Sequence, residues 1–294
     1  MLRPFELHQP ASIEAASRLR AQLGDDSAFY AGGTELLLVM KEGLLRYGHL
    51  IDLKTIPGMD AIQYDGERRE VRIGALATHS AIERAPIVRE RFPLLAEVER
   101  TVANVRVKNV GTIGGNLCFA EPHADPGTLF LACDAAVRLR GASGGREIPI
   151  GEFFRDAYET ARAPDEILDE IRLPVMGPHA RGAYMKFGFH ERPTLGVALV
   201  LTLDPRHESV EDVKVAVGCI HPCPTRLRKV EDRARGRSVR EVLAGLDEVA
   251  AAADGEVRAT TDLHGSAEYK QEMVKVFVRR AFRLAAARFN GGGR

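Results

Sequence analysis

The sequence carries no excess of charge of either sign. Lys and Arg together number 41, Asp and Glu together also number 41, and the formal net charge of the 294 residues is +0. Without a global field, the chain has no long-range attraction for nucleic acid or for an anionic membrane. The composition therefore disfavours functions that depend on a strongly basic surface.

Long apolar runs are also missing. The longest stretches, such as Val197–Leu203, end well before the roughly 18 residues that a transmembrane helix needs. The opening segment MLRPFELHQP lacks the apolar core of a secretory signal. We therefore expect a cytoplasmic protein without a membrane-spanning helix.

Cysteine is scarce. The four cysteines are Cys118, Cys133, Cys219 and Cys223. Without an export signal, we expect reduced thiols rather than disulfides. A two-iron cluster takes four thiolates, and only Cys219 and Cys223 are close in sequence, so no iron–sulfur cluster is expected. With His221 they form C-x-H-x-C, for which we favour a structural strand-to-turn segment over a zinc site because no second ligand cluster accompanies it.

The two commonest nucleotide-binding fingerprints are absent as well. The chain has neither the G-x-G-x-x-G of a Rossmann domain nor the G-x-x-x-x-G-K-[ST] of a P-loop. It has instead the turn Ala31-Gly32-Gly33-Thr34-Glu35 between a predicted strand and a predicted helix. Glycine permits a tight bend and close approach of a ligand, and free N–H groups at such a turn bind phosphate without a lysine.

A second glycine turn is expected at Gly111-Thr112-Ile113-Gly114-Gly115-Asn116. Two such turns predict a ligand with two phosphates, or an extended ligand threaded between them. Asp125 follows closely and is predicted to accept a hydrogen bond from a sugar or ribityl hydroxyl. One glycine pair alone is more often an ordinary turn, so the hypothesis depends on the two turns together.

Strands and helices alternate in the first part of the chain. Ser12 is a good N-cap and Gly24 a good stop for a helix at 13–23. The predicted order is strand Pro4–Leu7, helix Ile13–Leu23, strand Ala28–Ala31, helix Glu35–Lys41 and strand Leu50–Leu53. This pattern predicts a small βαβαβ unit.

Hairpin signals follow. The predicted elements are strands Ala61–Tyr64 and Glu70–Ile73 around Asp65-Gly66, helices Ser80–Arg84, Leu94–Ala103 and Gly127–Cys133, and strands Ala136–Arg140, Glu147–Ile150 and Ile167–Leu173. Pro174–Pro178, with two prolines and a glycine, is the expected domain boundary.

The C-terminal part is predicted to be a second α+β domain. Its predicted elements are strands Ala183–Phe189, Gly196–Leu203 and Val210–Val217, a helix at Val239–Leu246, and a helix from the N-cap Ser266 to about Phe289. Apolar residues recur every four positions in that last helix, which indicates one buried face. Residues 291–294 are expected to be frayed. We expect domains at 1–175 and 179–290.

At these motifs the sequence resembles the FAD-binding medium subunits of the molybdenum hydroxylase family, which includes carbon monoxide dehydrogenase and xanthine dehydrogenase. The markers are AGGTEL at 31–36, IGALATHSAIE at 73–83, VGTIGGNL at 110–117, ADPG at 124–127, DEILDEIRLP at 165–174 and SAEYKQEMVKVFVRRA at 266–281. Carbon monoxide dehydrogenase has His-Ser where this chain has Thr34-Glu35, so we expect closer kinship with other branches.

The resemblance implies an α+β fold. Its FAD-binding domain is of the type shared with p-cresol methylhydroxylase and vanillyl-alcohol oxidase (PCMH/VAO), with two α/β subdomains. A small C-terminal domain with a three-stranded antiparallel sheet and helices follows it. The implied cofactor contacts are Ala31, Gly32, Gly33, Thr34, Glu35 and Leu36 in the first turn, Thr78, Gly111, Thr112, Gly114, Gly115 and Asn116 around the second, and Asp125, Leu168 and Lys186.

The function implied by the resemblance is electron transfer. The chain would be an oxidoreductase subunit that holds FAD, takes electrons from a small iron–sulfur subunit and passes them to an external acceptor, while a large molybdopterin-binding subunit oxidises the substrate. A dimer of heterotrimers is the implied assembly, and no catalytic residue or metal ligand is expected in this chain. Two alternatives remain, a self-contained flavin reductase of the same superfamily and a scaffold subunit without cofactor.

Several other residues have two interpretations. His79 and His123 could touch a flavin, but ordinary loop histidines are favoured. Tyr184, Phe187 and Phe189 could stack on the ring, but core packing is favoured for aromatic residues in a strand. The basic run from Arg226 to Arg237 is interrupted by acids and is expected to be a solvated surface.

Overall fold

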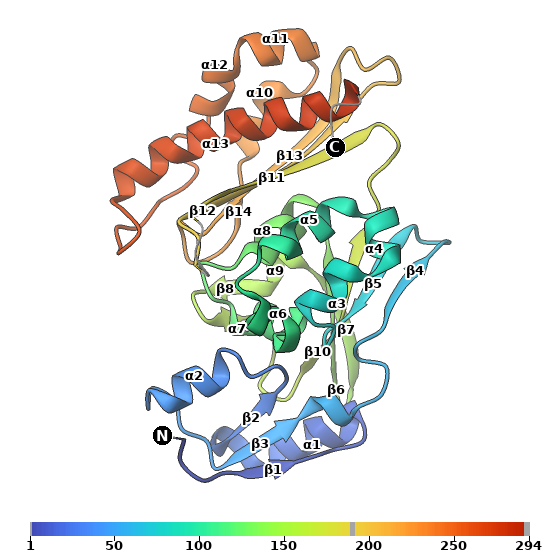
Figure 1. Cartoon of the computed structure of the whole chain (residues 1–294), viewed down its shortest axis with the longest axis vertical. Coiled ribbons are helices and arrows are strands. Elements are labelled where there is room, and N and C mark those ends of the chain that lie inside the picture. The colour runs from blue at the N-terminus through green and yellow to red at the C-terminus, as the bar shows by residue number, and fades with distance from the viewer. Residues whose placement is uncertain (1, 189–191, 291–294) are drawn as a thin grey trace. The chain divides into compact units, whose positions relative to one another are not determined.

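The computed structural model describes residues 2–188 and 192–290. The chain forms two compact units (Figure 1). The first unit contains the chain up to Ala120 and Ala136–Leu173, and the second contains Glu121–Ala135 and the chain from Pro174 onward. The segment 121–135 thus packs with the second unit, although it lies within the range 1–175. The expectations for Phe189 and for the tail at 291–294 lie outside the described residues.

The N-terminal part of the first unit is a parallel sheet with two helices. Its strands are β1 (Glu6–His8), β2 (Ser27–Tyr30) and β3 (His49–Asp52), in the order β1-β3-β2. Helix α1 (Ile13–Leu23) begins at Ser12, whose hydroxyl accepts from the Ala15 amide, and ends at Gly24 with φ 60°. Helix α2 (Leu36–Lys41) precedes β3. The predicted βαβαβ unit and both signals for α1 are confirmed.

A five-stranded sheet forms the other part of the first unit, in the order β4-β5-β10-β6-β7. These strands are β4 (Ile62–Asp65), β5 (Glu70–Gly74), β6 (Ala136–Gly141), β7 (Gly144–Pro149) and β10 (Ile167–Pro174). The predicted hairpin β4/β5 is confirmed, and the predicted strands at 136–140 and 147–150 correspond to β6 and β7, which pair as a second hairpin. Strand β10 joins them, since it lies between β5 and β6 and turns four apolar side chains into the core.

Short helices surround this sheet, and the sequence predicted only some of them. They are α3 (His79–Arg84), α4 (Pro86–Arg91), α5 (Pro93–Thr101), α6 (Val105–Val110), α7 (Ile113–Phe119) and α9 (Ile150–Phe153), with the short strands β8 (Phe154–Asp156) and β9 (Glu159–Thr160). The prediction of a glycine loop near 111–115 is wrong. Thr112 caps helix α7, and Gly114 and Gly115 lie in the first turn of that helix. Glycine is a poor helix former, and the sequence therefore did not reveal α7.

The second unit is built on an antiparallel sheet in the order β11-β12-β13-β14. Its strands are β11 (Ala180–Phe187), β12 (Leu195–Leu203), β13 (Val210–Gly218) and β14 (Thr225–Arg226). The three predicted strands are present, and the two-residue strand β14 adds a fourth. Eight of the nine residues of β12 are buried, which is typical of a central strand covered on both faces.

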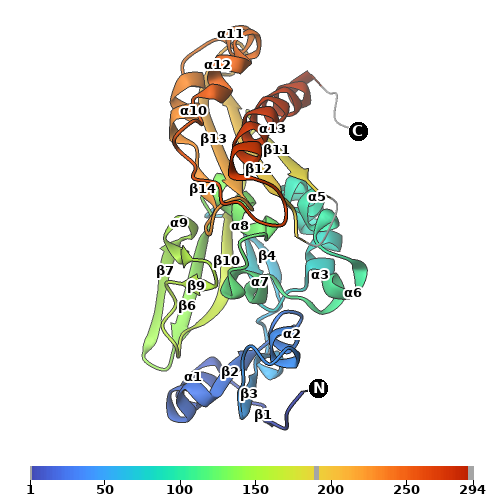
Figure 2. The ribbon, with the colours of Figure 1, turned by 90° about the vertical axis from the view of Figure 1, so that its left-hand side faces the viewer.

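The alternation of side chains assigns each face of this sheet to a different set of helices. Val197, Leu199 and Leu201 share one hydrophobic core with α10 (Arg228–Ala234), α11 (Val239–Ala244), α12 (Leu246–Ala251) and α13 (Ala267–Ala287). The opposite face, which carries Tyr184 and Gly218, packs against α8 (Asp125–Ala132). Helix α13 lies along the first face and α8 on the second (Figure 2). The predicted buried face of α13 is confirmed.

Helix α13 is the longest helix in the described residues, and it is not apolar enough to cross a bilayer; nor is any other helix in that part of the chain.

Candidate cofactor site

The first glycine turn links the end of β2 to the start of α2, and close packing imposes its glycines. A Cβ atom at Gly32 would lie 2.1 Å from the Val110 carbonyl oxygen, which no real side chain tolerates. Gly33 has φ 71°, in the left-handed region that favours glycine. The turn is therefore pressed against the segment Val110–Gly111, although nearly 80 residues of sequence separate the two.

The turn offers backbone donors that the protein does not use. Within the described residues, nothing accepts a hydrogen bond from the backbone N–H groups of Gly32, Gly33 or Thr34. The neighbouring carbonyls are engaged, since Gly33 accepts from Leu37 and Glu35 accepts from Val39. Adjacent donors without acceptors form the kind of concavity that binds phosphate oxygens. The three unused N–H groups are thus the donors that the predicted anion site at this turn requires.

Lys54 supports this turn and was not identified from the sequence. Its Nζ donates to the Ala31 carbonyl at 3.0 Å and to Asp52 at 2.7 Å, and lies 3.7 Å from the centre of the Tyr30 ring. Lys54 follows β3, and the parallel pairing of β2 with β3 brings it beside the turn. No local motif marks this lysine, so only the strand order could have revealed it.

The second glycine segment is not a set of free amides. The amides of Ile113 and Gly114 donate to the carbonyls of Ala77 and Ala75, and those of Gly115 and Asn116 donate to the hydroxyl and carbonyl of Thr112. The hypothesis that these amides hold a phosphate is therefore wrong for residues 113–116. Gly114 serves packing instead, because a Cβ atom there would lie 2.5 Å from the Ala75 Cβ.

The second segment does offer an unsatisfied side chain. The Oδ1 atom of Asn116 is buried and has no hydrogen-bond partner in the described residues. Buried polar atoms are nearly always paired in folded proteins, so this oxygen points to a donor supplied by a bound molecule or water. Thr78 lies beside Thr112 through a β-bridge, and each caps the helix that follows it.

The structure brings the predicted residues of the first unit close together in several places. Gly32 contacts Gly111 backbone, and a Cβ atom at Gly111 would lie 3.5 Å from the Thr34 Oγ1. Leu168 is buried in β10. It also lies next to Cys118 of α7. Burial raises the pKa of the Cys118 thiol, and a hydrogen bond between this thiol and the Leu168 backbone lowers that pKa in part. The two glycine segments are thus neighbours, as the sequence hypothesis requires.

Asp125 and Lys186 belong to the second unit, where the buried Asp125 forms a polar cluster with the half-buried Tyr184 and Lys186. The Tyr184 hydroxyl donates to Asp125 Oδ1 and the Lys186 ammonium donates to Oδ2, both at 2.7 Å. Burial, followed by the charge of Asp125, raises the pKa of Tyr184. Gly196 makes room for this hydroxyl, since a Cβ atom there would lie 2.4 Å from it. Both carboxylate oxygens are engaged within the protein, and a cofactor contact by Asp125 or Lys186 stays a prediction.

The residues with two interpretations take up ordinary structural roles. His79 is buried and pairs with the buried Glu99, with Nδ1 and Oε2 at 2.7 Å. His123 bonds to the Pro193 carbonyl through Nδ1 at 2.8 Å. Phe187 packs against Phe277 with ring centres 5.5 Å apart. Each of these side chains has a protein partner, in agreement with the favoured interpretations.

The C-x-H-x-C segment and the basic run also have protein partners. His221 Nδ1 lies 3.4 Å from the Cys223 amide, and Cys219 is buried. No group of metal ligands includes these three residues in the described part of the chain. The basic run forms the ion pairs Arg226–Asp134, Arg226–Glu231, Arg228–Glu231, Arg233–Glu248, Arg235–Asp212 and Arg235–Asp232. Several of these pairs are exposed, as expected for a solvated surface.

Comparison with known proteins identifies the class. Residues 3–176 match the family described as "FAD binding domain in molybdopterin dehydrogenase", and residues 190–285 match "CO dehydrogenase flavoprotein C-terminal domain". The chain is 34% identical to the carbon monoxide dehydrogenase medium chain of Hydrogenophaga pseudoflava, over 97% of this chain and 98% of that one. It is 32% identical to the nicotine 6-hydroxylase medium subunit of Paenarthrobacter nicotinovorans, over 95% and 96%.

A solved structure agrees in fold over the same length. Carbon monoxide dehydrogenase from Hydrogenophaga pseudoflava, in a form that lacks the Mo-pyranopterin moiety, matches with a TM-score of 0.93 and 33% identity, over 98% of this chain and 99% of that chain. The chain belongs to the FAD-binding medium subunits of the molybdenum hydroxylase family. Its identity to the carbon monoxide dehydrogenase chain is no lower than to the nicotine 6-hydroxylase subunit, so the expected closer kinship with other branches is wrong.

Proposed function

We propose that this chain is the electron-transfer subunit of a molybdenum hydroxylase complex. A large molybdopterin-binding subunit oxidises the organic substrate, and a small iron–sulfur subunit supplies the electrons that this chain passes to an external acceptor. The three subunits assemble as a dimer of heterotrimers. The names of the relatives support membership of a multi-subunit complex, because they are medium chains or medium subunits of such enzymes.

One observation carries the assignment of the cofactor site. The backbone N–H groups of Gly32, Gly33 and Thr34 have no acceptor in the described residues, and the close contact of Gly32 with Val110 fixes them in place. Three amides of this kind suit the diphosphate of FAD. When bound, FAD supplies a group that accepts single electrons and releases them in pairs.

The other residues of the site hold and shape the cofactor. Asn116 Oδ1, buried and without a partner in the described residues, accepts a hydrogen bond from it. Leu168 supplies an apolar contact, and cofactor contacts by Asp125 and Lys186 stay predictions from the sequence. The remaining contacts are proposed at Ala31, Glu35, Leu36, Thr78, Gly111 and Thr112. No residue of this chain acts as an acid, base or nucleophile toward the organic substrate.

The experiment that tests the proposal replaces Gly32 by alanine. Because the new Cβ would lie 2.1 Å from the Val110 carbonyl oxygen, the turn must move, and we expect FAD affinity to fall by at least about tenfold. Bound flavin is measured by absorbance and by fluorescence after release. Gly66→Ala is the matched control, since a Cβ there would meet only the Tyr64 ring at 3.7 Å, and it should keep wild-type FAD content.

The same preparations separate the proposal from its two alternatives. We expect the isolated wild-type chain to bind FAD and to oxidise no organic substrate until the large and small subunits are added. Steady turnover of NADPH with a substrate by the chain alone would point to a self-contained flavin reductase. A wild-type chain that stays colourless with added FAD would point to a scaffold subunit.

A further inference from the structure

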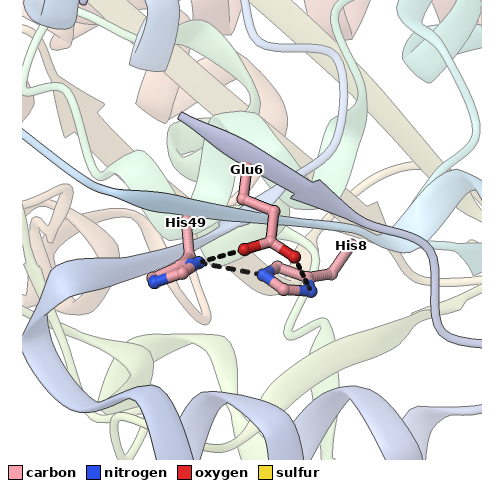
Figure 3. A group of neighbouring side chains, drawn as sticks. All are labelled: Glu6, His8 and His49. Carbon is pink, nitrogen blue, oxygen red and sulfur yellow. Dashed lines mark hydrogen bonds and ion pairs between the residues drawn. The ribbon is translucent and has the colours of Figure 1, made fainter. Parts of the chain in front are cut away.

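Three metal-ligating side chains gather on one face of the N-terminal parallel sheet, in a place with no part in the cofactor site. Glu6 and His8 lie two residues apart on β1, so their side chains point to the same face. His49 opens the neighbouring strand β3 and is the direct register partner of Glu6. The three side chains point toward one another (Figure 3).

The distances between their donor atoms suit a single ion. His8 Nε2 and His49 Nδ1 are 3.0 Å apart, and Glu6 Oε2 lies 3.5 Å from His49 Nδ1. One ligand atom from each of the three residues lies within 4.8 Å of the others. Two ligands of a tetrahedral zinc ion, each about 2.0–2.1 Å from the metal, lie roughly 3.3 Å apart. Only small side-chain rotations are therefore needed to bring all three ligands onto one ion.

The chemistry of the donors selects the kind of ion. Two imidazole nitrogens and one carboxylate suit zinc and its neighbours among the transition metals, whereas magnesium and calcium prefer oxygen ligands. The side chains of Glu6, His8 and His49 are 66%, 21% and 28% exposed, which leaves a fourth position open to water. Two His ligands and one Glu with an open position are a known zinc ligand set.

We propose that Glu6, His8 and His49 bind one divalent ion of the zinc type and thereby fasten β1 to β3. Strand β1 has only three residues and forms one edge of its sheet. An ion with two ligands on β1 and one on β3 links that edge strand to the central strand. In the described part of the chain no other set of three side chains meets the same criterion for a metal site.

Without a metal, the simplest interpretation of this geometry is a hydrogen bond between the two imidazoles. A second histidine pair in the same molecule allows a comparison. His179 Nδ1 and His207 Nε2 also lie within hydrogen-bond distance, at 3.3 Å. That pair belongs to the second unit, and no third ligand joins it among the described residues. The carboxylate of Glu6 is therefore the feature that separates a metal site from a histidine pair.

The test is a zinc titration of the full-length chain after treatment with a chelator. Isothermal titration calorimetry should show one zinc ion bound per wild-type chain. A titration with magnesium should give no heat of binding. At about 100 times the dissociation constant, zinc should raise the melting temperature by roughly 5 °C. His49→Gln and Glu6→Gln should each weaken zinc binding by at least about tenfold and remove most of the thermal shift.

The double variant His179→Gln/His207→Gln is the matched control, and it should bind zinc as the wild type does. Circular dichroism and bound FAD verify that each variant is folded, and if His49→Gln does not fold, His8→Gln replaces it. The proposal fails if the two site variants keep wild-type zinc affinity. It also fails if the control pair abolishes the binding, because histidines outside this cluster would then hold the ion.

Discussion

The glycines have different structural roles in the two glycine-rich segments. At Gly32 the missing side chain lets a second backbone segment approach and leaves adjacent amides without an acceptor in the described residues. At Gly114 it lets a helix pack against Ala75, and the amide there is already engaged. The two segments look alike as sequences. An amide that already donates to a protein acceptor is not available to a phosphate, so the donors for one lie in the first segment and not at residues 113–116 of the second.

Burial gives Cys133 a measurable effect on stability in alkali. Burial raises the pKa of its thiol from 9.0 to about 12. The unfolded chain therefore loses this proton at lower pH than the folded chain, so the contribution is fully present below pH 9 and is lost as the pH rises toward 12. At pH 10.5 the loss attributable to Cys133 is about 2 kcal/mol.

We therefore predict that Cys133→Ala narrows the stability difference between pH 7.5 and pH 10.5. The free energy of unfolding in urea, measured for wild type and variant at both pH values, gives the comparison. The alanine variant will be less stable than wild type at pH 7.5, because a buried group is removed. An equal alkaline loss in both proteins would show that Cys133 titrates alike in the folded and unfolded chains.

At the scale of single elements, the caps of α1 and α7 permit a direct comparison. Ser12 and Thr112 each accept a hydrogen bond from the backbone amide three residues later, at 3.1 Å in both cases. Replacing either by alanine should cost about 1 kcal/mol of stability. Helix α7 also carries Asn116, whose buried Oδ1 lacks a partner in the described residues, whereas α1 carries no proposed cofactor contact.

We expect Thr112→Ala to lower FAD affinity and Ser12→Ala to leave it unchanged, although both lower the unfolding free energy by similar amounts. Urea unfolding measures the stability of each variant, and a fluorescence titration with FAD measures the affinity. A parallel loss of FAD affinity in both variants would mean that cofactor binding reports overall stability and not the position of α7.

Elements with strong local signals were predicted from the sequence, and those that depend on distant partners were not. Helix α1 has a serine cap, a glycine stop and one apolar face, and its predicted bounds agree with the structure. Helix α7 begins Ile-Gly-Gly, a sequence that local propensity assigns to a loop; its cap and the acceptors at Ala75 and Ala77 stabilise it instead. Likewise, Lys54 reaches the first glycine turn only because β2 and β3 pair.

At the scale of the whole molecule, the second unit consists of two separate parts of the chain, and it is complete only when the segment Glu121–Ala135 is present. Helix α8 lies in this segment and covers the face of the sheet that carries Tyr184 and Gly218. A Cβ atom at Gly218 would lie 1.9 Å from the Thr128 Oγ1, so helix and sheet pack very closely. A fragment that begins near residue 174 lacks this cover, and most of β12 would lose burial on one face.

We predict that the fragment 174–290 alone aggregates or binds a hydrophobic dye, and that the same fragment with residues 121–135 fused through a flexible linker does neither. Exposed apolar sheet faces bind such dyes and promote association, whereas α8 restores the missing layer and the partners of Tyr184 and Lys186 at Asp125. Dye fluorescence and thermal unfolding of both fragments provide the measurement. If the shorter fragment melts cooperatively at the temperature of the fused one, α8 adds nothing to the second unit, and the sheet with α10–α13 is a complete fold without it.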